Sequence, residues 1–424
     1  MVGQAILCMF IKEDDLKIAG PAKSAADKGV IFLLDGFSPE YISWEDMPSL
    51  RHLRQAGAHT LHALDIIPSL SNVNHVSLLT GTYPERHGIT GNYYLQATSG
   101  REVFMDRAEY IQGRLLFERA REAGLSTMLV TAKEKLTRLL NRGLDMCVDA
   151  TSSPTHLAER LGKAPSIYSA EMTPWVLRAA KMMAEEGHPD LMYIATTDYM
   201  EHAYGPQVPQ MQQQAREMDA LIGDVITAFD LSQTVVVVAA DHGMNQKTKA
   251  LSIPNVLAQA GIKAHVIPAI KDGLYLHHRN LGGAVYVYLE ESQEVGRAQE
   301  VLAGQEGVAE DILASAAPAH HLPPEAVGDM LVLGEKEWAL GTWGEGVEVR
   351  EVADLRSHGS RFEQEVPLIL AGAGVKAGVR LKSVSLVDLA PTVAHLLGLD
   401  KSGFQGRVLE EALKAGEGTF RQHS

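Results

Sequence analysis

Short, β-branched apolar runs recur along the chain, and each one ends in a polar residue or a glycine. The runs are VIFLLDG (30–36), STMLVTAK (126–133), LMYIATTD (191–198), TVVVVAADHG (234–243) and VPLILAG (366–372). Uninterrupted apolar strands of this kind are typical of a parallel sheet that helices cover on both faces. The segments between them carry helical patterns, as in 113–124 and 173–187. The alternation therefore predicts an α/β fold with a doubly wound, mostly parallel sheet.

The pattern changes between residues 246 and 352. AVYVYLE (284–290) and MLVLGEKEWAL (330–340) look like strands of a smaller α+β unit with Pro- and Gly-containing turns. The core pattern then resumes and closes with a helical pattern in 385–399. At about 150 residues per domain, 424 residues suffice for a large core with an insertion. We therefore expect a core of residues 1–245 and 353–424, with an inserted cap, 246–352, over the strand ends.

Several predicted strands end in a residue that can do chemistry. Asp35, Lys133, Asp198 and Asp241 each stand where an apolar run stops. In a doubly wound sheet, functional groups gather beyond the carboxyl ends of the strands. We therefore expect these side chains at one edge of the sheet.

Composition narrows the range of partners. The chain has 38 basic and 53 acidic side chains, a net charge of −15, which argues against a nucleic-acid or anionic-membrane partner. A small anionic substrate is compatible with this charge, because a bound metal can reverse the local field. Cys8 and Cys147 are the only cysteines, which excludes a disulfide scaffold and a Cys-rich zinc site and leaves 17 histidines as potential ligands. No apolar run approaches the roughly 20 residues of a membrane span, and no secretory signal stands out, so we expect a cytoplasmic protein.

Each candidate functional residue has an ordinary structural explanation when it is taken alone. These residues are Asp35, Ser71, Asp198, His202, Asp241, His242 and His358. A helix through DYMEH would place Asp198 and His202 on one face, where they could bind a cation or merely form a helix pair. Ser71 occupies a position typical of a helix N-cap. An aspartate before a glycine is usually a turn residue, and a lone histidine before a strand is usually structural.

The order of these residues resembles the ligand series of the alkaline phosphatase superfamily. Aspartate, serine, DxxxH, DH and histidine follow one another along the chain at the predicted strand ends. The resemblance extends to TGTYPERHGITGN (80–92) and VDLAPTVAHLLG (387–398) and spans residues 28–245 and 355–400. Within the superfamily, the chain is similar to the nucleotide pyrophosphatase/phosphodiesterase branch, which includes the phosphonoacetate hydrolases.

This resemblance implies two zinc ions per chain. One zinc would be held by Asp198, His202 and His358, and the second by Asp35, Asp241, His242 and the hydroxyl of Ser71. Ser71 would also be the nucleophile, and two zinc ions can stabilise the attacking and leaving oxygens of a displacement at phosphorus. The branch usually carries threonine at this position. The serine preserves the hydroxyl but leaves the substrate less defined.

A lysine pair indicates one substrate class. Phosphonoacetate hydrolases carry two lysines, spaced by one residue after a core strand, which bind the substrate carboxylate; Lys133 and Lys135 match that spacing. Asn92, 21 residues after Ser71, matches the asparagine that contacts a phosphoryl oxygen in this branch. The alternative for the lysines is a solvated helix start, although positive charge there opposes the helix dipole. Further histidines that we expect to be structural are His87, His277, His278, His320 and His321.

The resemblance thus predicts a di-zinc hydrolase that cleaves the C–P bond of phosphonoacetate into acetate and phosphate through Ser71. We expect a small anionic phosphonate or phosphoester substrate and no nucleic-acid or membrane partner, and we leave a homodimer open. The alternative is a type I phosphodiesterase or nucleotide pyrophosphatase, in which a base-binding pocket replaces the lysine pair. The absence of a Cys/Ser-x-Pro-x-Arg element around Ser71 argues against a sulfatase. The complete ligand set argues against an inactive binding protein.

Overall fold

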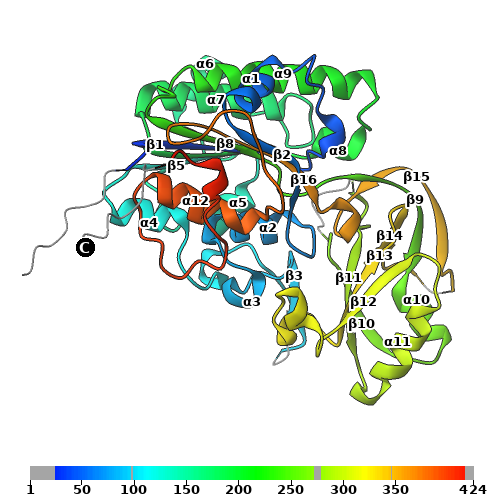
Figure 1. Ribbon diagram of the computed structural model, residues 1–424. Helices are drawn as coiled ribbons and strands as arrows, with labels where there is room; N and C mark the ends of the chain where they lie inside the picture. Colours follow the sequence, from blue (N-terminus) through cyan, green and yellow to red (C-terminus); the bar gives the residue numbers. More distant parts are fainter. Residues whose placement is uncertain (1–23, 97–98, 272–277, 345, 416–424) are drawn as a thin grey trace, which may run out of the picture.

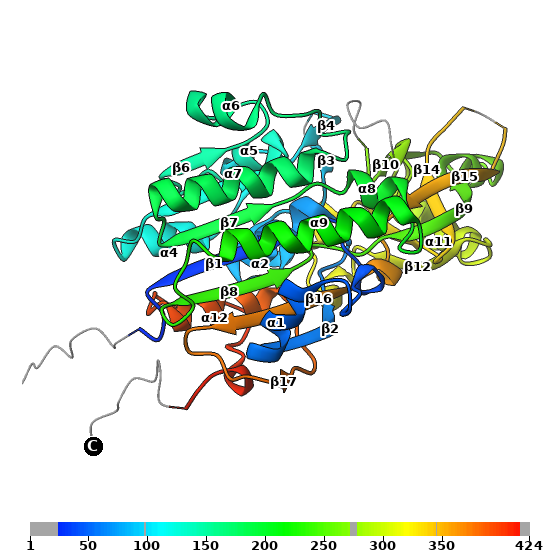
Figure 2. The same ribbon diagram turned by 90° about the horizontal axis from the view of Figure 1, so that it is seen from above.

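An eight-stranded sheet forms the centre of the fold (Figures 1 and 2). The computed structural model describes residues 24–96, 99–271, 278–344 and 346–415. From one edge to the other, the strands are β17 (Val379–Arg380), β2 (Ala58–Leu64), β16 (Glu365–Gly372), β8 (Thr234–Ala239), β1 (Lys28–Leu33), β7 (Leu191–Ala195), β5 (Thr127–Thr131) and β6 (Met146–Val148). Strands β8, β1, β7, β5 and β6 are parallel neighbours.

Helices cover both faces of this sheet (Figure 1). One face carries α1 (Pro48–Ala56), α7 (Met172–Gly187) and α9 (Pro209–Ile226), and the other carries α2 (Ser71–Thr80), α4 (Leu116–Glu122) and α12 (Leu389–Leu396). In α7, Val176, Ala180 and Met183 recur every three or four residues and are all buried, as an amphipathic helix on a sheet requires. The predicted α/β fold with a doubly wound, mostly parallel sheet is confirmed.

Strand β16 runs against the direction of its neighbours. It contains the predicted strand VPLILAG, but it pairs antiparallel with both β8 and β2. Its residue Leu368 lies opposite Ala239, at the end of β8, and Gly372 lies opposite Val235. The chain therefore enters β16 from the edge where the parallel strands end, and it must run back through the sheet. An apolar run does not encode this direction.

Three strands of the central sheet were not among the predicted ones, and one of them is the two-residue edge strand β17. Strand β2 has the sequence AHTLHAL, in which buried and more exposed positions nearly alternate because it lies next to the edge strand β17. Strand β6 has only 3 residues and forms the opposite edge. Neither has the long apolar run of a strand that is buried on both faces.

Two smaller sheets form between β8 and β16. One has the order β14-β9-β15 and the other β10-β11-β13-β12. Their elements are β9 (Asn245–Ser252), α10 (Ile253–Gln259), β10 (Ala264–Pro268), β11 (Ala284–Leu289), α11 (Val295–Ala303), β12 (Val308–Leu313), β13 (Met330–Gly334), β14 (Trp338–Gly341) and β15 (Val349–Ser357). The run 330–340 divides into β13 and β14, which lie in different sheets. The boundaries of the expected cap fall inside β9 and β15, and Figures 1 and 2 show the two sheets beside the ends of β1, β7 and β8.

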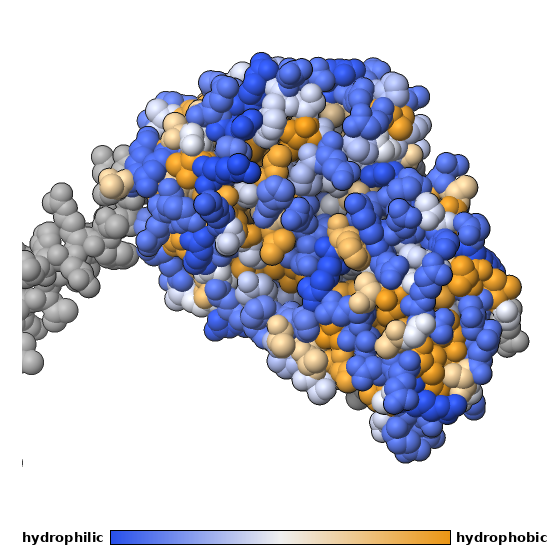
Figure 3. Space-filling view, turned by 45° about the vertical axis from the view of Figure 1, so that its right-hand side comes forward, coloured by the Kyte–Doolittle hydropathy of each residue, from blue (hydrophilic) through white to orange (hydrophobic). Residues whose placement is uncertain are grey.

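The surface differs between the two parts of the chain. Figure 3 shows a largely hydrophilic surface over the core and exposed hydrophobic residues over the smaller sheets.

Among the described residues, no helix has both the length and the apolar composition that crossing a bilayer requires.

Candidate metal centre

Adjacent strands bring the predicted side chains to one edge of the central sheet. Asp35 follows β1, Asp198 follows β7, Lys133 follows β5, and Asp241 and His242 follow β8. Because β8, β1, β7 and β5 are consecutive and parallel, their carboxyl ends lie side by side. Gly36 allows the sharp turn after β1: its φ is +70°, and its amide donates to Oδ1 of Asp241 (3.1 Å).

The first triad consists of Asp198, His202 and His358. One potential ligand atom from each lies within 4.8 Å of the others. Helix α8 (Tyr199–Ala203) begins after Asp198, and the His202 amide donates to the Asp198 carbonyl (2.9 Å), so the helix expected in DYMEH is present. Their side chains meet on one face, with His202 Nε2 3.3 Å from Asp198 Oδ2. His358 arrives from β15, directly before the chain turns into β16.

The second triad consists of Asp35, Asp241 and His242, which satisfy the same 4.8 Å criterion. Nε2 of His242 lies 3.4 Å from Asp35 Oδ1 and 3.5 Å from Asp241 Oδ2. The two triads are adjacent, because the rings of His242 and His358 stack with their centroids 3.5 Å apart. The side chains lie in the same two groups as predicted, and every member of both triads is at most 6% exposed.

Backbone carbonyl groups orient the three imidazoles toward the centre. Nδ1 of His202 donates to the Arg356 carbonyl (2.7 Å), Nδ1 of His242 to the Gly243 carbonyl (3.0 Å), and Nδ1 of His358 to the Ser69 carbonyl (2.7 Å). Because a carbonyl only accepts, each neutral ring keeps its lone pair on Nε2, which is how a metal ligand is oriented.

Two carboxylate oxygens complete a donor set that fits a metal. Oδ1 of Asp35 and Oδ2 of Asp241 are buried, and neither has a hydrogen-bond partner among the described residues. A buried anionic oxygen without a donor is unfavourable unless a cation compensates it. Imidazole nitrogens and carboxylate oxygens in groups of three suit Zn²⁺.

The charges at the second triad determine its protonation. Burial, reinforced by the charge of Asp35, raises the pKa of Asp241 to about 6. Burial alone would lower the pKa of His242, but Asp241 and Asp35 raise it to about 9. Burial, together with the charges of His242 and His202, holds the pKa of His358 well below its ordinary value, so this ring is neutral. A cation that binds the second triad near neutral pH must therefore displace the His242 proton.

We expect zinc affinity to depend steeply on pH. Between pH 6 and pH 9, binding should release one proton from His242, so the affinity should rise about tenfold per pH unit. Below about pH 6, Asp241 is also protonated and the affinity should fall faster. Zinc titrations against a competing chelator at pH 5.5, 7 and 8.5 measure this slope. Equal affinity at the lowest and highest pH would contradict it.

Lys133 lies between the two triads. Its Nζ is 2.5 Å from Oδ2 of Asp35 and 3.0 Å from Oδ1 of Asp198. Burial alone would lower the pKa of Lys133, but the two carboxylates raise it well above its ordinary value. Because Lys133 is only 4% exposed, it is not the solvated residue of the alternative interpretation. Lys135 is half-buried in the first turn of α5 (Glu134–Leu140), and Asn92, directly before β3 (Tyr93–Gln96), has a buried Oδ1 without a hydrogen-bond partner among the described residues.

Ser71 is the first residue of α2, and its hydroxyl faces the second triad. Leu70 occupies the N-cap position and no side chain caps the helix, so the N-cap interpretation of Ser71 is wrong. Ser71 Oγ lies 3.2 Å from Nε2 of His242. The helix start is held from the other side, because Leu70 and Val73 belong to a hydrophobic cluster with Tyr286 of β11.

The sequence reasoning missed His75, which lies four residues after Ser71 on the same helix. Its Nε2 is 3.7 Å from Oδ2 of Asp241, and its Nδ1 is 2.8 Å from the Tyr193 hydroxyl. Burial lowers the pKa of His75 to about 3, so the ring is neutral. The spacing of four from Ser71 was the available signal, because it places both residues on one helix face.

The other histidines considered above that the structure describes belong to neither triad. His87 is buried and makes a hydrogen bond with Ser77 Oγ (2.9 Å). His321 stacks on Tyr83 at a centroid distance of 4.0 Å, and His320 contacts Arg361 (2.9 Å). The ring of His278 lies 6.1 Å from that of His202, whereas His277 lies outside the described residues.

Comparisons with known proteins show which family and which solved structures this chain resembles. The model of the family described as type I phosphodiesterase / nucleotide pyrophosphatase matches residues 30–361. The crystal structure of phosphonoacetate hydrolase from Sinorhizobium meliloti 1021 in complex with phosphonoacetate has a TM-score of 0.74 at 29% identity, covering 86% of this chain and 94% of that one. Murine ectonucleotide pyrophosphatase / phosphodiesterase 5 shares the fold, with a TM-score of 0.70 at 15% identity over 91% of this chain and 100% of that one. A mouse bis(5'-adenosyl)-triphosphatase is 22% identical over 89% of this chain and 78% of its own length.

Proposed function

The chain belongs to the type I phosphodiesterase / nucleotide pyrophosphatase family, and we propose that it is a di-zinc hydrolase that cleaves the C–P bond of phosphonoacetate. The observation that supports a hydrolase is the presence of two adjacent buried triads, with the Ser71 hydroxyl 3.2 Å from His242 of the second one. The lysine pair after β5 supports phosphonoacetate as the substrate. The 29% identity to a phosphonoacetate hydrolase over 86% of this chain supports it as well.

We assign one zinc to Asp198, His202 and His358, and the second to Asp35, Asp241, His242 and the Ser71 hydroxyl. When bound, the zinc ions would neutralise charge on the phosphoryl group and lower the pKa of the Ser71 hydroxyl. The N-terminus of α2, where Ser71 stands, adds a positive field that favours an anionic substrate.

In the first step of the proposed reaction, the Ser71 hydroxyl gives up its proton to solvent and its Oγ attacks phosphorus. The C–P bond breaks, and its electron pair leaves with the carboxymethyl group, which takes up a proton and becomes acetate. Lys133 and Lys135 at the substrate carboxylate would stabilise the charge that develops there, and the Asn92 amide would donate to a phosphoryl oxygen. Water then hydrolyses the phosphoserine, which releases phosphate and restores the hydroxyl.

A phosphodiesterase acting on nucleotides is the second candidate, because a cavity that three tyrosines help to line borders α8; no residue of the triads lines it. This cavity has a volume of about 550 Å³, and its lining includes Tyr168, Tyr199 and Tyr204. Tyr199 directly follows Asp198, and tyrosine rings are suitable partners for a stacked base.

Phosphate release from phosphonoacetate, measured beside hydrolysis of a nitrophenyl phosphodiester, distinguishes the two candidates. Faster turnover of phosphonoacetate supports the C–P hydrolase. Turnover of the diester alone overturns that substrate and supports the phosphodiesterase. If the zinc-loaded protein hydrolyses neither compound, the result contradicts both candidate functions.

The Lys135→Ala variant tests the carboxylate clamp. A charge-assisted hydrogen bond is worth about 1.5–3 kcal/mol, so kcat/KM for phosphonoacetate should fall roughly 10- to 100-fold. The diester has no carboxylate at this place, and its turnover should change little. Lys133→Ala discriminates less well, because Lys133 also contacts Asp35 and Asp198 and its loss should affect both substrates. Equal losses for both substrates in Lys135→Ala would remove the clamp from the proposal.

A further inference from the structure

A buried ion pair joins the smaller sheets to the loop behind the metal centre. Lys247 of β9 and Glu363 of the short helix η8 (Arg361–Glu363) are 2.9 Å apart, and both side chains are 0% exposed. Residues 247 and 363 are 116 positions apart in the sequence. A fully buried ion pair is a weak source of stability, because its desolvation offsets most of the attraction. Its position therefore needs another explanation.

Both members of this ion pair make further hydrogen bonds. The Glu363 carboxylate accepts hydrogen bonds from Lys247 Nζ (2.9 Å), Asn245 Nδ2 (2.7 Å) and the amide and hydroxyl of Ser360 (2.9 and 2.8 Å). Lys247 Nζ also donates to the Lys336 carbonyl (2.8 Å), in the turn between β13 and β14. Burial would raise the pKa of Glu363, but Lys247 and these donors lower it, so the carboxylate is charged.

Two successive hydrogen bonds connect the backbone of Glu363 to the His242 ring. Its carbonyl accepts from the Gly243 amide (2.7 Å), and the Gly243 carbonyl accepts from His242 Nδ1 (3.0 Å). A Cβ at position 243 would lie only 2.9 Å from the Glu363 carbonyl oxygen, which explains the glycine.

Contacts through Ser69 connect the same Glu363 carbonyl to His358. The Ser69 hydroxyl lies 3.3 Å from this carbonyl oxygen and contacts the Asp65 carboxylate more closely, and the Ser69 carbonyl accepts from His358 Nδ1 (2.7 Å). The Glu363 carbonyl therefore contacts Gly243 and Ser69, the two residues whose own carbonyl groups accept from His242 and His358.

We propose that Lys247 and Glu363 form a positioning unit through which the smaller sheets orient His242 and His358 for metal binding. This inference rests on the proposed function, because it presumes that the two triads bind metal. Groups that orient metal ligands typically change metal affinity or activity 10- to 100-fold when they are removed. We expect a change of about this size at both sites when the ion pair is broken.

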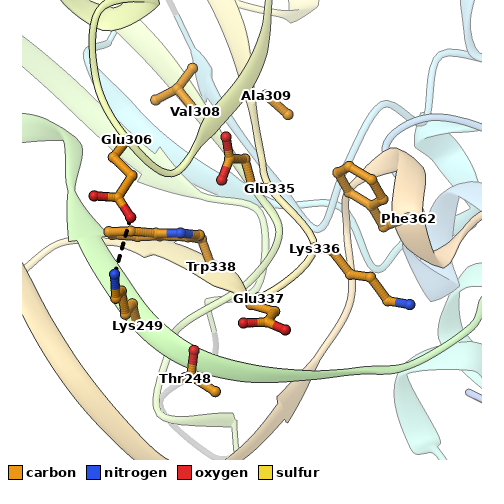
Figure 4. A pocket seen from close by; sticks show the side chains of 10 residues that line it. All are labelled: Thr248, Lys249, Glu306, Val308, Ala309, Glu335, Lys336, Glu337, Trp338 and Phe362. Carbon is orange, nitrogen blue, oxygen red and sulfur yellow. Dashed lines mark hydrogen bonds and ion pairs between the residues drawn. The ribbon is translucent and has the colours of Figure 1, made fainter.

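An exposed ion pair on the same strand provides a matched control. Lys249, two residues after Lys247, pairs with Glu306 (3.1 Å) beside a cavity of about 690 Å³. Figure 4 shows the members of this pair on either side of the Trp338 ring. Neither member of the control pair contacts Glu363 or a residue of the triads among the interactions of the described residues.

The test compares Glu363→Gln and Lys247→Met with the control Lys249→Met. Zinc affinity and stoichiometry are measured against a competing chelator, and the Tm of the metal-free proteins is measured separately. Spectra of the Co²⁺-loaded proteins report ligand geometry. We expect zinc affinity to fall about 10- to 100-fold at both sites in the first two variants, with altered Co²⁺ spectra, and no change in Lys249→Met.

The double variant Lys247→Met/Glu363→Gln separates positioning from stability. It leaves no unpaired buried charge, so its Tm should exceed that of either single variant while its zinc affinity stays low. Wild-type zinc affinity and Co²⁺ spectra in these variants, even with a lower Tm, would overturn the inference. If the wild-type protein itself binds no zinc, the proposed function fails first, and the two failures are thereby distinguished.

Discussion

Replacing Ser71 with alanine should abolish phosphate release, with a loss of roughly 10⁴-fold or more in kcat, because we propose that Ser71 supplies the attacking oxygen. Both triads keep their three side chains in this variant, and three protein ligands suffice to hold zinc. The metal content should therefore stay at about two ions per chain. Phosphate release and metal analysis of the same preparation test the two expectations together.

The Ser71→Thr variant is the matched control for the nucleophile. Threonine keeps the hydroxyl and is the residue that the resembling branch usually carries, so most of the activity should remain. Removal of a helix cap typically lowers the free energy of unfolding by about 1 kcal/mol. Neither Ser71→Ala nor Ser71→Thr should have this effect, because the Ser71 side chain does not cap α2. Undiminished activity in Ser71→Ala would exclude Ser71 as the nucleophile.

Replacing His358 with alanine should lower the bound zinc from about two ions to about one and reduce kcat by roughly 10³-fold. The first triad would keep only Asp198 and His202, and two protein ligands are too few for a stable zinc site. The lost ion would stabilise charge in the transition state by several kcal/mol, and about 1.4 kcal/mol corresponds to each factor of ten. Metal analysis after dialysis and steady-state kinetics measure both effects.

His321→Ala is a suitable control for this experiment. His321 has a half-exposed side chain, contacts Tyr83 and Glu85, and belongs to neither triad. Its replacement should leave zinc content and kcat unchanged. If His358→Ala retained two zinc ions and full activity, His358 would have to be removed from the metal centre.

The segment between β8 and β16 contributes residues to this centre. His358 directly follows its last strand, β15, and Lys247 lies in its first strand, β9. These two strands pair antiparallel, with Leu355 opposite Lys247 and Ser357 opposite Asn245. One strand pair thus carries a candidate metal ligand and the lysine that we propose to position it. Replacing either His358 or Lys247 should therefore change metal binding.

Local sequence patterns predicted much of the core. The long apolar runs became β1, β5, β7, β8 and β16, because a strand that is buried on both faces needs apolar side chains at every position. Polar residues at the ends of parallel strands gathered at one edge for the same topological reason. The alternating strand β2 and the short strand β6 escaped prediction, because their patterns do not differ from those of loops.

Part of the grouping of the candidate ligands followed from local sequence spacing, and part followed only from the family resemblance. The spacing of Asp198 and His202 was sufficient to place them together, since one helical turn brings both to the same face. The membership of His358 in that triad followed only from the family resemblance. No local pattern links residue 358 to a helix that begins at residue 199.

Only the tertiary structure decided the direction of β16, the place of Lys133 and the contacts of Lys247. The direction of β16 follows from the point where the chain returns from the smaller sheets. Lys133 was predicted to lie at a strand end, but its contact with Asp35 and Asp198 depends on how β1, β5 and β7 lie side by side. Lys247 occurs in a polar stretch, NQKTK, that indicates exposure, yet Glu363 pairs with it in the interior. A buried charge is stabilised only by partners that folding brings from distant parts of the chain, so no local pattern records it.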